Sequence, residues 1–133
     1  MKATELMMGD LVFLKQIGPV KISSISDDEI DVRKPDADGE LEYYIIYDDE
    51  FDELTPIPIT TEILDKNFKE SIPGINLMYD LRGPYMASDE RGQWVFGLIK
   101  RDASARYPLV KITFVHELQH ALRLCGIEHE IIL

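Results

Sequence analysis

Several features that would indicate a function directly are scarce or missing in this sequence. Its 133 residues include one cysteine, Cys125, so the chain can form neither an intramolecular disulfide nor a cysteine-rich zinc module. No apolar run approaches the roughly 18–20 residues of a membrane span, and the start of the chain has no signal-peptide core. We therefore expect a cytoplasmic protein, where reducing conditions keep a lone thiol free.

Basic residues are also few. The chain has 14 Lys and Arg against 25 Asp and Glu, a formal net charge of −11. Almost all of this excess lies in residues 1–58, where fifteen acidic and five basic side chains give −10, while residues 59–133 carry −1. This balance disfavours nucleic-acid binding strongly for the N-terminal half and less strongly for the C-terminal half. Glycine-rich phosphate loops are absent, so we expect no nucleotide cofactor.

The first half has the pattern of strands. Short runs rich in β-branched and aromatic residues alternate with Gly, Pro and Asp turn signals. The runs cover residues 11–14, 20–25, 29–32 and 41–47. Strands at this spacing, with almost no helical period, predict a small N-terminal antiparallel β-barrel of the Src-homology type over residues 1–58.

The second half, residues 59–133, mixes both periods, so the predicted fold class is α+β. Thr60 or Thr61 has the position of an N-cap for a short helix that ends near Asn67. A longer helix is predicted to start between Leu109 and Thr113 and to stop at Gly126. Strands are predicted at residues 75–79, 84–87, 93–99 and, as a final strand, 127–133. Residues 89–92 are predicted as a hairpin turn.

One motif on the longer helix could carry chemistry. Residues 116–120 read H-E-L-Q-H, in which His116 and His120 stand one turn apart on one helix face. That spacing lets two imidazoles share a zinc ion while Glu117 acts as general base on bound water. The motif resembles that of a zinc-dependent metallopeptidase.

Three considerations weigh against this interpretation. The apolar residues of the helix gather on one side, so His116 and His120 are expected opposite, toward solvent. A catalytic zinc needs a third ligand, and the remaining histidine, His129, lies on the strand face expected to point into the core. Thirteen residues follow His120, too few to complete such a site easily. The apolar side consists of Phe114, Val115, Leu118, Ala121, Leu122 and Cys125.

Three stretches carry a resemblance to other proteins: residues 6–12, residues 53–64 with Asn67-Phe68, and residues 114–119. Together they resemble a group of short uncharacterised proteins of Bacteroides-type gut bacteria, often encoded beside phage or mobile-element genes. The resemblance covers most of the chain in the same order. It implies a small cytoplasmic protein without an assigned activity, and it carries over no catalytic residues.

Two surface features remain open to more than one interpretation. Residues 48–53 hold five carboxylates, which indicates either a solvated loop or, less strongly, a cation site or a surface that imitates DNA phosphates. Tyr43, Tyr44 and Tyr47 are interpreted as barrel core, with a recognition surface as the alternative. Lys100, Arg101, Arg106 and Lys111 form the one basic cluster.

The sequence thus favours a non-enzymatic protein-interaction module of phage or mobile-element origin, with a protein as its partner. The alternative is a zinc hydrolase in which His116, His120 and His129 hold the metal and Glu117 is the base. Zinc is a cofactor only under this alternative. The two hypotheses differ in whether the H-E-x-x-H side chains converge with a third ligand.

Overall fold

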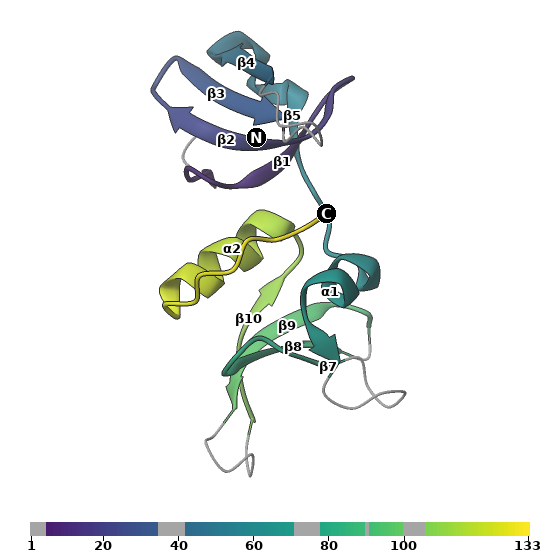
Figure 1. Cartoon of the computed structure of the whole chain (residues 1–133). Coiled ribbons are helices and arrows are strands. Elements are labelled where there is room, and N and C mark those ends of the chain that lie inside the picture. The colour runs from purple at the N-terminus through teal and green to yellow at the C-terminus, as the bar shows by residue number, and fades with distance from the viewer. Residues whose placement is uncertain (1–4, 35–41, 71–77, 90, 100–105) are drawn as a thin grey trace. The chain divides into compact units, whose positions relative to one another are not determined.

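The computed structural model describes residues 5–34, 42–70, 78–89, 91–99 and 106–133. Contacts between these residues divide the chain into two compact units, Met1–Ile57 and Pro58–Leu133 (Figure 1). Each unit is built on its own antiparallel sheet, which confirms the α+β fold class. Within the described parts of the chain, no helix has the length and apolar character that a membrane span requires.

The first unit consists of five antiparallel strands in the order β4-β3-β2-β1-β5. Its elements are β1 (Leu11–Leu14), β2 (Gly18–Ile25), β3 (Glu29–Lys34), β4 (Glu42–Tyr47), the 3-10 helix η2 (Asp48–Glu53) and β5 (Leu54–Pro56). Four of these strands match the predicted runs closely. The short β5 was not predicted, because three residues between an acidic turn and two prolines show no alternation.

The core of the first unit follows from the two-residue period of its strands. Side chains of a strand point alternately to its two faces, so every second residue of β1 to β4 enters the same core. Leu6 and Leu54 join this core from outside the four strands, and Phe51 packs against it from η2. The buried members from β1 to β4 are Val12, Leu14, Val20, Ile22, Ile30, Val32 and Ile46.

The sheet of the first unit is open, whereas the sequence predicts a small Src-homology-like barrel and leaves its closure undecided. Among the described strands, β4 and β5 are the two edges, and no ladder joins them. Both edges are short, and η2 stands between them along the chain. The sequence pattern identified the strands correctly but not the pairing, because alternation reports which face a residue takes and not which strand lies next to it.

The second unit holds two helices and an antiparallel sheet in the order β10-β9-β8-β7-β6. Its elements are α1 (Thr61–Asn67), the two-residue β6 (Lys69–Glu70), β7 (Met78–Asp80), β8 (Pro84–Ser88), β9 (Trp94–Ile99), β10 (Arg106–Ile112) and α2 (Val115–Leu124). The predicted hairpin turn joins β8 to β9, and Gly92 takes a positive φ of 77° there. Residues 75–77 of a predicted strand lie outside the described residues, while Met78 and Tyr79 belong to β7.

At Gly97 of β9, the neighbouring strands β8 and β10 leave no room for a side chain. A Cβ on Gly97 of β9 would meet the Tyr107 carbonyl oxygen of β10 and would lie 2.7 Å from Cε1 of Tyr85 in β8. Tyr85 is buried over this gap. Gly97 is therefore the point at which the buried tyrosine ring packs on the backbone of its neighbour strand.

Three of the four predicted helix boundaries agree with the structure, and the start of α2 does not. Thr60 is the N-cap of α1, and its hydroxyl oxygen accepts a hydrogen bond from the Ile63 N–H at 3.3 Å, as predicted. The predicted stop of α2 at Gly126 is also confirmed: Gly126 has a φ of 71°, and Ile127 N–H donates to the Leu122 carbonyl at 2.9 Å. The predicted start between Leu109 and Thr113 is wrong, because those residues belong to or follow β10.

The chain after α2 is not the predicted final strand. Its backbone pairs with a side chain instead: the amide of Asn67 donates to the Ile132 carbonyl at 2.7 Å and accepts from the Ile132 N–H at 2.7 Å. The same amide nitrogen also donates to the Ile63 carbonyl within α1. An asparagine side chain thus supplies the donor and acceptor that a neighbouring strand would supply.

Replacing Asn67 by Ala should destabilise the protein by about 0.5–1.5 kcal/mol, because the exposed Ile132 backbone exchanges both Asn67 partners for water. Urea denaturation measures the free energy of unfolding, and hydrogen exchange at the Ile132 amide locates the loss. The matched control is Lys66→Ala, an exposed position of the same helix, for which we expect a change within about 0.5 kcal/mol. Equal effects of the two substitutions would contradict the anchoring role of Asn67.

Candidate functional site

The H-E-L-Q-H motif occupies the first turns of α2. His116 is 7% exposed, and its ring stacks almost parallel on Phe114, with ring centroids 5.9 Å apart. His120 meets His116 edge to face, with centroids 5.7 Å apart. The two histidines therefore do lie one above the other, as their spacing predicts.

The expectation that these histidines face solvent is wrong for His116. The buried side chains of α2 are Val115, His116, Leu118, Gln119 and Leu122. They cover more of the helix circumference than the single apolar stripe that the sequence shows. Cys125, which the stripe places inside, is exposed at the C-cap.

Glu117 acts as a cap for the helix that carries it. One carboxylate oxygen, Oε1, accepts hydrogen bonds from the Phe114 N–H at 2.9 Å and the Thr113 N–H at 3.1 Å. Glu117 is the third residue of α2, the position from which a glutamate reaches back to the N-cap backbone. Phe114, the N-cap, has no side-chain acceptor, so this carboxylate stabilises the helix start alone.

His129 lies with a different set of residues. Its ring packs on Phe68, with centroids 4.7 Å apart, and its Nε2 is 3.3 Å from Oδ1 of Asn67. Burial of the imidazole, and secondarily the positive charge of Arg82, lowers the pKa of His129 below its ordinary value. Within the described residues, no three His, Cys, Asp or Glu side chains form a group that could hold a metal ion.

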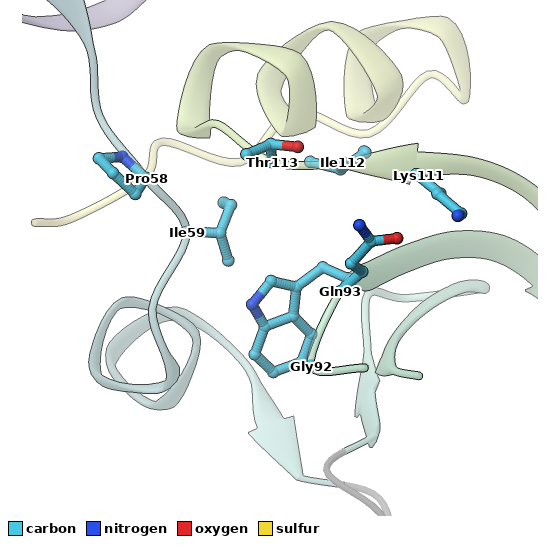
Figure 2. Close-up of a pocket in the computed structure, with 8 residues that line it drawn as sticks. Pro58, Ile59, Gly92, Gln93, Lys111, Ile112 and Thr113 are labelled. Atoms are coloured by element: carbon cyan, nitrogen blue, oxygen red, sulfur yellow. The ribbon is translucent and has the colours of Figure 1, made fainter. Parts of the chain in front are cut away.

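A small pocket lies beside the beginning of α2 (Figure 2). Its volume is about 250 Å³, below the roughly 300–1,000 Å³ of most ligand sites. Three of its residues, Ile59, Trp94 and Ile112, are buried, and Lys111 is its one charged residue. The remaining lining residues are Pro58, Gly92, Gln93 and Thr113. Because none of these residues is His, Cys, Asp or Glu, the pocket lacks an acid–base pair.

A more distinctive surface lies on β4, the edge strand of the first unit. Tyr43 is 60% exposed, Ile45 is 50% exposed and Tyr47 is 51% exposed. Between them, Ile46 is buried and Tyr44 packs against the core. The core interpretation is therefore correct for Tyr44 and wrong for Tyr43 and Tyr47. The signal was available in the sequence, since residues 43–47, Y-Y-I-I-Y, are all aromatic or apolar in a strand that needs such residues only at alternate positions.

The acidic segment after β4 is a short 3-10 helix. Phe51 fixes η2 to the core of the first unit, while the Asp48 carboxylate accepts a hydrogen bond from the Asp49 N–H. The residues around Phe51 are polar and not buried. The segment is therefore an ordered acidic surface and not an irregular loop.

The second unit also has an exposed apolar edge. Tyr107, Leu109 and Val110 of β10 are each more than half exposed, and Leu98 pairs with Tyr107 on the neighbouring strand. A register shift between Pro108 and Val110 interrupts this ladder. Of the predicted basic cluster, Arg106 and Lys111 lie on β10, whereas Lys100 and Arg101 fall outside the described residues.

Comparison of the chain with protein-family models, with curated proteins and with solved structures finds no match. The functional assignment therefore depends on the geometry of the chain itself.

Changing Glu117 distinguishes a helix cap from a general base. Glu117→Ala should cost about 0.5–2 kcal/mol, because the Thr113 and Phe114 N–H groups lose their acceptor. Glu117→Gln should cost much less, since glutamine also accepts at this position. Thermal and urea denaturation of both variants measure the difference. If Gln destabilises as much as Ala, the amide does not replace the carboxylate and the cap does not explain the residue.

The lowered pKa of His129 predicts a pH dependence of stability. As the pH falls, His129 is protonated in the unfolded chain before it is protonated in the folded chain. The contribution of His129 to the free energy of unfolding is therefore complete above about pH 6.5 and decreases below it. Urea midpoints at about pH 7.5 and 5.5 should therefore separate more for the wild type than for His129→Gln, whose amide can still contact Asn67. An identical separation for both proteins would contradict the lowered pKa.

Proposed function

We propose that the chain is a non-enzymatic protein-interaction module that binds another protein through β4. The observation that carries this proposal is the row of Tyr43, Ile45 and Tyr47, all half exposed or more, on an edge strand. Tyrosine and isoleucine side chains in such a row offer large contact areas, and tyrosine is enriched at protein interfaces. Proteins normally protect an apolar edge with charges, proline or a covering element. An apolar edge that none of the described strands pairs with therefore supports a binding surface.

Strand order, resemblance and charge of the first unit also support an interaction module. A sheet whose first strand lies between the second and the last, with a 3-10 helix before the last strand, supports a Src-homology-like strand order for the open sheet of the acidic unit. The resemblance to short Bacteroides-type proteins supports a cytoplasmic role in a phage or mobile-element setting. The charge of −10 on this unit makes a nucleic acid a poor partner for it and a protein a suitable one.

The zinc-hydrolase alternative has less support from the geometry. The Glu117 carboxylate, which would have to activate water, is engaged by two backbone donors. His129 contacts Asn67 and Phe68. No observation on the described residues adds a third ligand to His116 and His120.

The proposal predicts that a partner depends on the β4 row. The full-length chain should capture a bacterial protein in stoichiometric amount, and Tyr43→Ser/Ile45→Ser/Tyr47→Ser should reduce that capture at least about tenfold. Quantitative mass spectrometry of the captured material measures this ratio, and circular dichroism checks that the variant is folded.

The matched control replaces three other exposed apolar side chains, Met8→Ser/Leu124→Ser/Ile132→Ser. Because these three side chains lie outside β4, their replacement should leave the amount of captured protein unchanged. Equal capture by the β4 variant and the wild type would overturn the proposal. So would peptide hydrolysis by the purified chain that disappears in Glu117→Gln.

A further inference from the structure

The backbone of β4 is oriented so that the exposed residues also present their hydrogen-bonding groups. The Asp48 N–H donates to the Asp28 carbonyl at 2.9 Å, which continues the register of β3 and β4 one position beyond the Glu29–Tyr47 pair. In an antiparallel ladder, hydrogen-bonded pairs alternate with non-bonded ones. The bonded positions of β4 are therefore Glu42, Tyr44 and Ile46, of which Tyr44 and Ile46 face the core.

The remaining positions follow from the same alternation. Tyr43 and Ile45 direct their N–H and C=O groups away from β3, toward the free edge of the described sheet. Tyr47 directs its N–H the same way, while its carbonyl stands at the start of η2 as the N-cap. The same three residues expose their side chains. An extended segment laid along β4 would therefore gain main-chain hydrogen bonds and apolar contacts from the same residues, the combination on which strand addition depends.

The charged residues around the β4 edge indicate which charge a bound peptide segment should carry. Glu29 lies opposite Tyr47 in the register and Asp31 lies opposite Ile45, so both acids flank the exposed row. Arg33, opposite Tyr43, is the single basic residue in this flank. Beyond Tyr47 the chain continues directly into η2, which adds Asp48, Asp49, Glu50, Asp52 and Glu53. The acidity is therefore concentrated at the Tyr47 end.

The same charges argue against a second copy of the chain as the occupant. Two β4 edges that paired with each other would bring together two units of charge −10. Such like-charge juxtaposition costs several kcal/mol and is a recurring means of suppressing wrong partners. A basic segment gains from the field that penalises self-association.

We infer that β4 binds a basic, extended peptide segment of the partner as an additional strand, with its Lys or Arg side chains toward the Tyr47 end. This inference rests on the proposed function and specifies the chemistry of its partner. The apolar side chains of the segment lie on Tyr43 and Ile45, and its basic side chains reach Glu29 and the carboxylates of η2.

Synthetic peptides test this inference on the full-length, isotope-labelled chain. Three peptides of about nine residues, enough to span β4 at roughly 3.3 Å per residue, carry valine on the face that lies on Tyr43 and Ile45. They differ at the positions of the same face that lie at the Tyr47 end, which carry lysine, serine or glutamate. The lysine peptide should shift the amide resonances of Tyr43, Ile45 and Tyr47 and slow their hydrogen exchange. It should bind at least about tenfold more tightly than the serine peptide at low ionic strength, and the difference should shrink as salt is added.

A charge variant isolates the electrostatic contribution without touching the β4 row. Asp48→Asn/Asp49→Asn/Glu50→Gln should weaken the lysine peptide about tenfold and leave the serine peptide unchanged. A matched control removes acids far from β4 in the sequence and in the second unit, Glu128→Gln/Glu130→Gln, and should leave both affinities unchanged.

Each of the other possible results contradicts one part of the inference or of the proposed function. Equal binding of the lysine and serine peptides overturns the basic partner, and resonance shifts confined to η2 overturn strand addition. Concentration-dependent shifts at β4 without peptide identify a second copy as the occupant and overturn the inference. If no peptide binds while capture still depends on the β4 row, the inference fails and the proposed function stands. Capture that ignores the β4 row removes the proposed function itself.

Discussion

Side chains in a strand alternate between two faces, and this constraint determines what the first unit can present to other molecules. Burying Ile46 and packing Tyr44 against the core forces Tyr43, Ile45 and Tyr47 to the opposite face. In an interior strand that face would meet other side chains of the sheet on both sides. In β4, an edge of the described sheet, it meets them on one side only. A run that is apolar at every position therefore becomes an exposed apolar row because of where the strand lies.

The two units use their carboxylates differently. In the second unit several are occupied by backbone donors: Glu117 at the start of α2, Asp80 with the Arg82 N–H, and Asp89 with the N–H groups of Arg91 and Gln93. In the first unit Asp10 serves in the same way, with the Met7 N–H on its carboxylate, but most acids lie on the surface. The acidic excess of the sequence is thus concentrated where it can influence association.

Local patterns predicted the parts of the fold that depend on neighbours in sequence. Alternation located β1 to β4, the Thr60 hydroxyl located the start of α1, and Gly126 located the end of α2. The parts that were missed depend on distant contacts. Asn67 and Ile132 are 65 positions apart, and no local pattern shows that a side-chain amide pairs with the tail. The predicted start of α2, between Leu109 and Thr113, lies too early because β10 runs almost directly into α2 and is interrupted by a register shift.

The placement of Glu117 has a consequence for recognising zinc helices from sequence. Glutamate is favoured as the third residue of a helix whatever the protein does, since it can reach back to the free N–H groups there. A histidine directly before the glutamate and another three positions after it complete an H-E-x-x-H match at a helix start, as His116 and His120 do around Glu117 in α2. Motif searches will therefore collect helix beginnings along with metal sites. Counting the glutamate's position from the N-cap separates a carboxylate that must hold the first turn from one deeper in a helix that is free to take a proton.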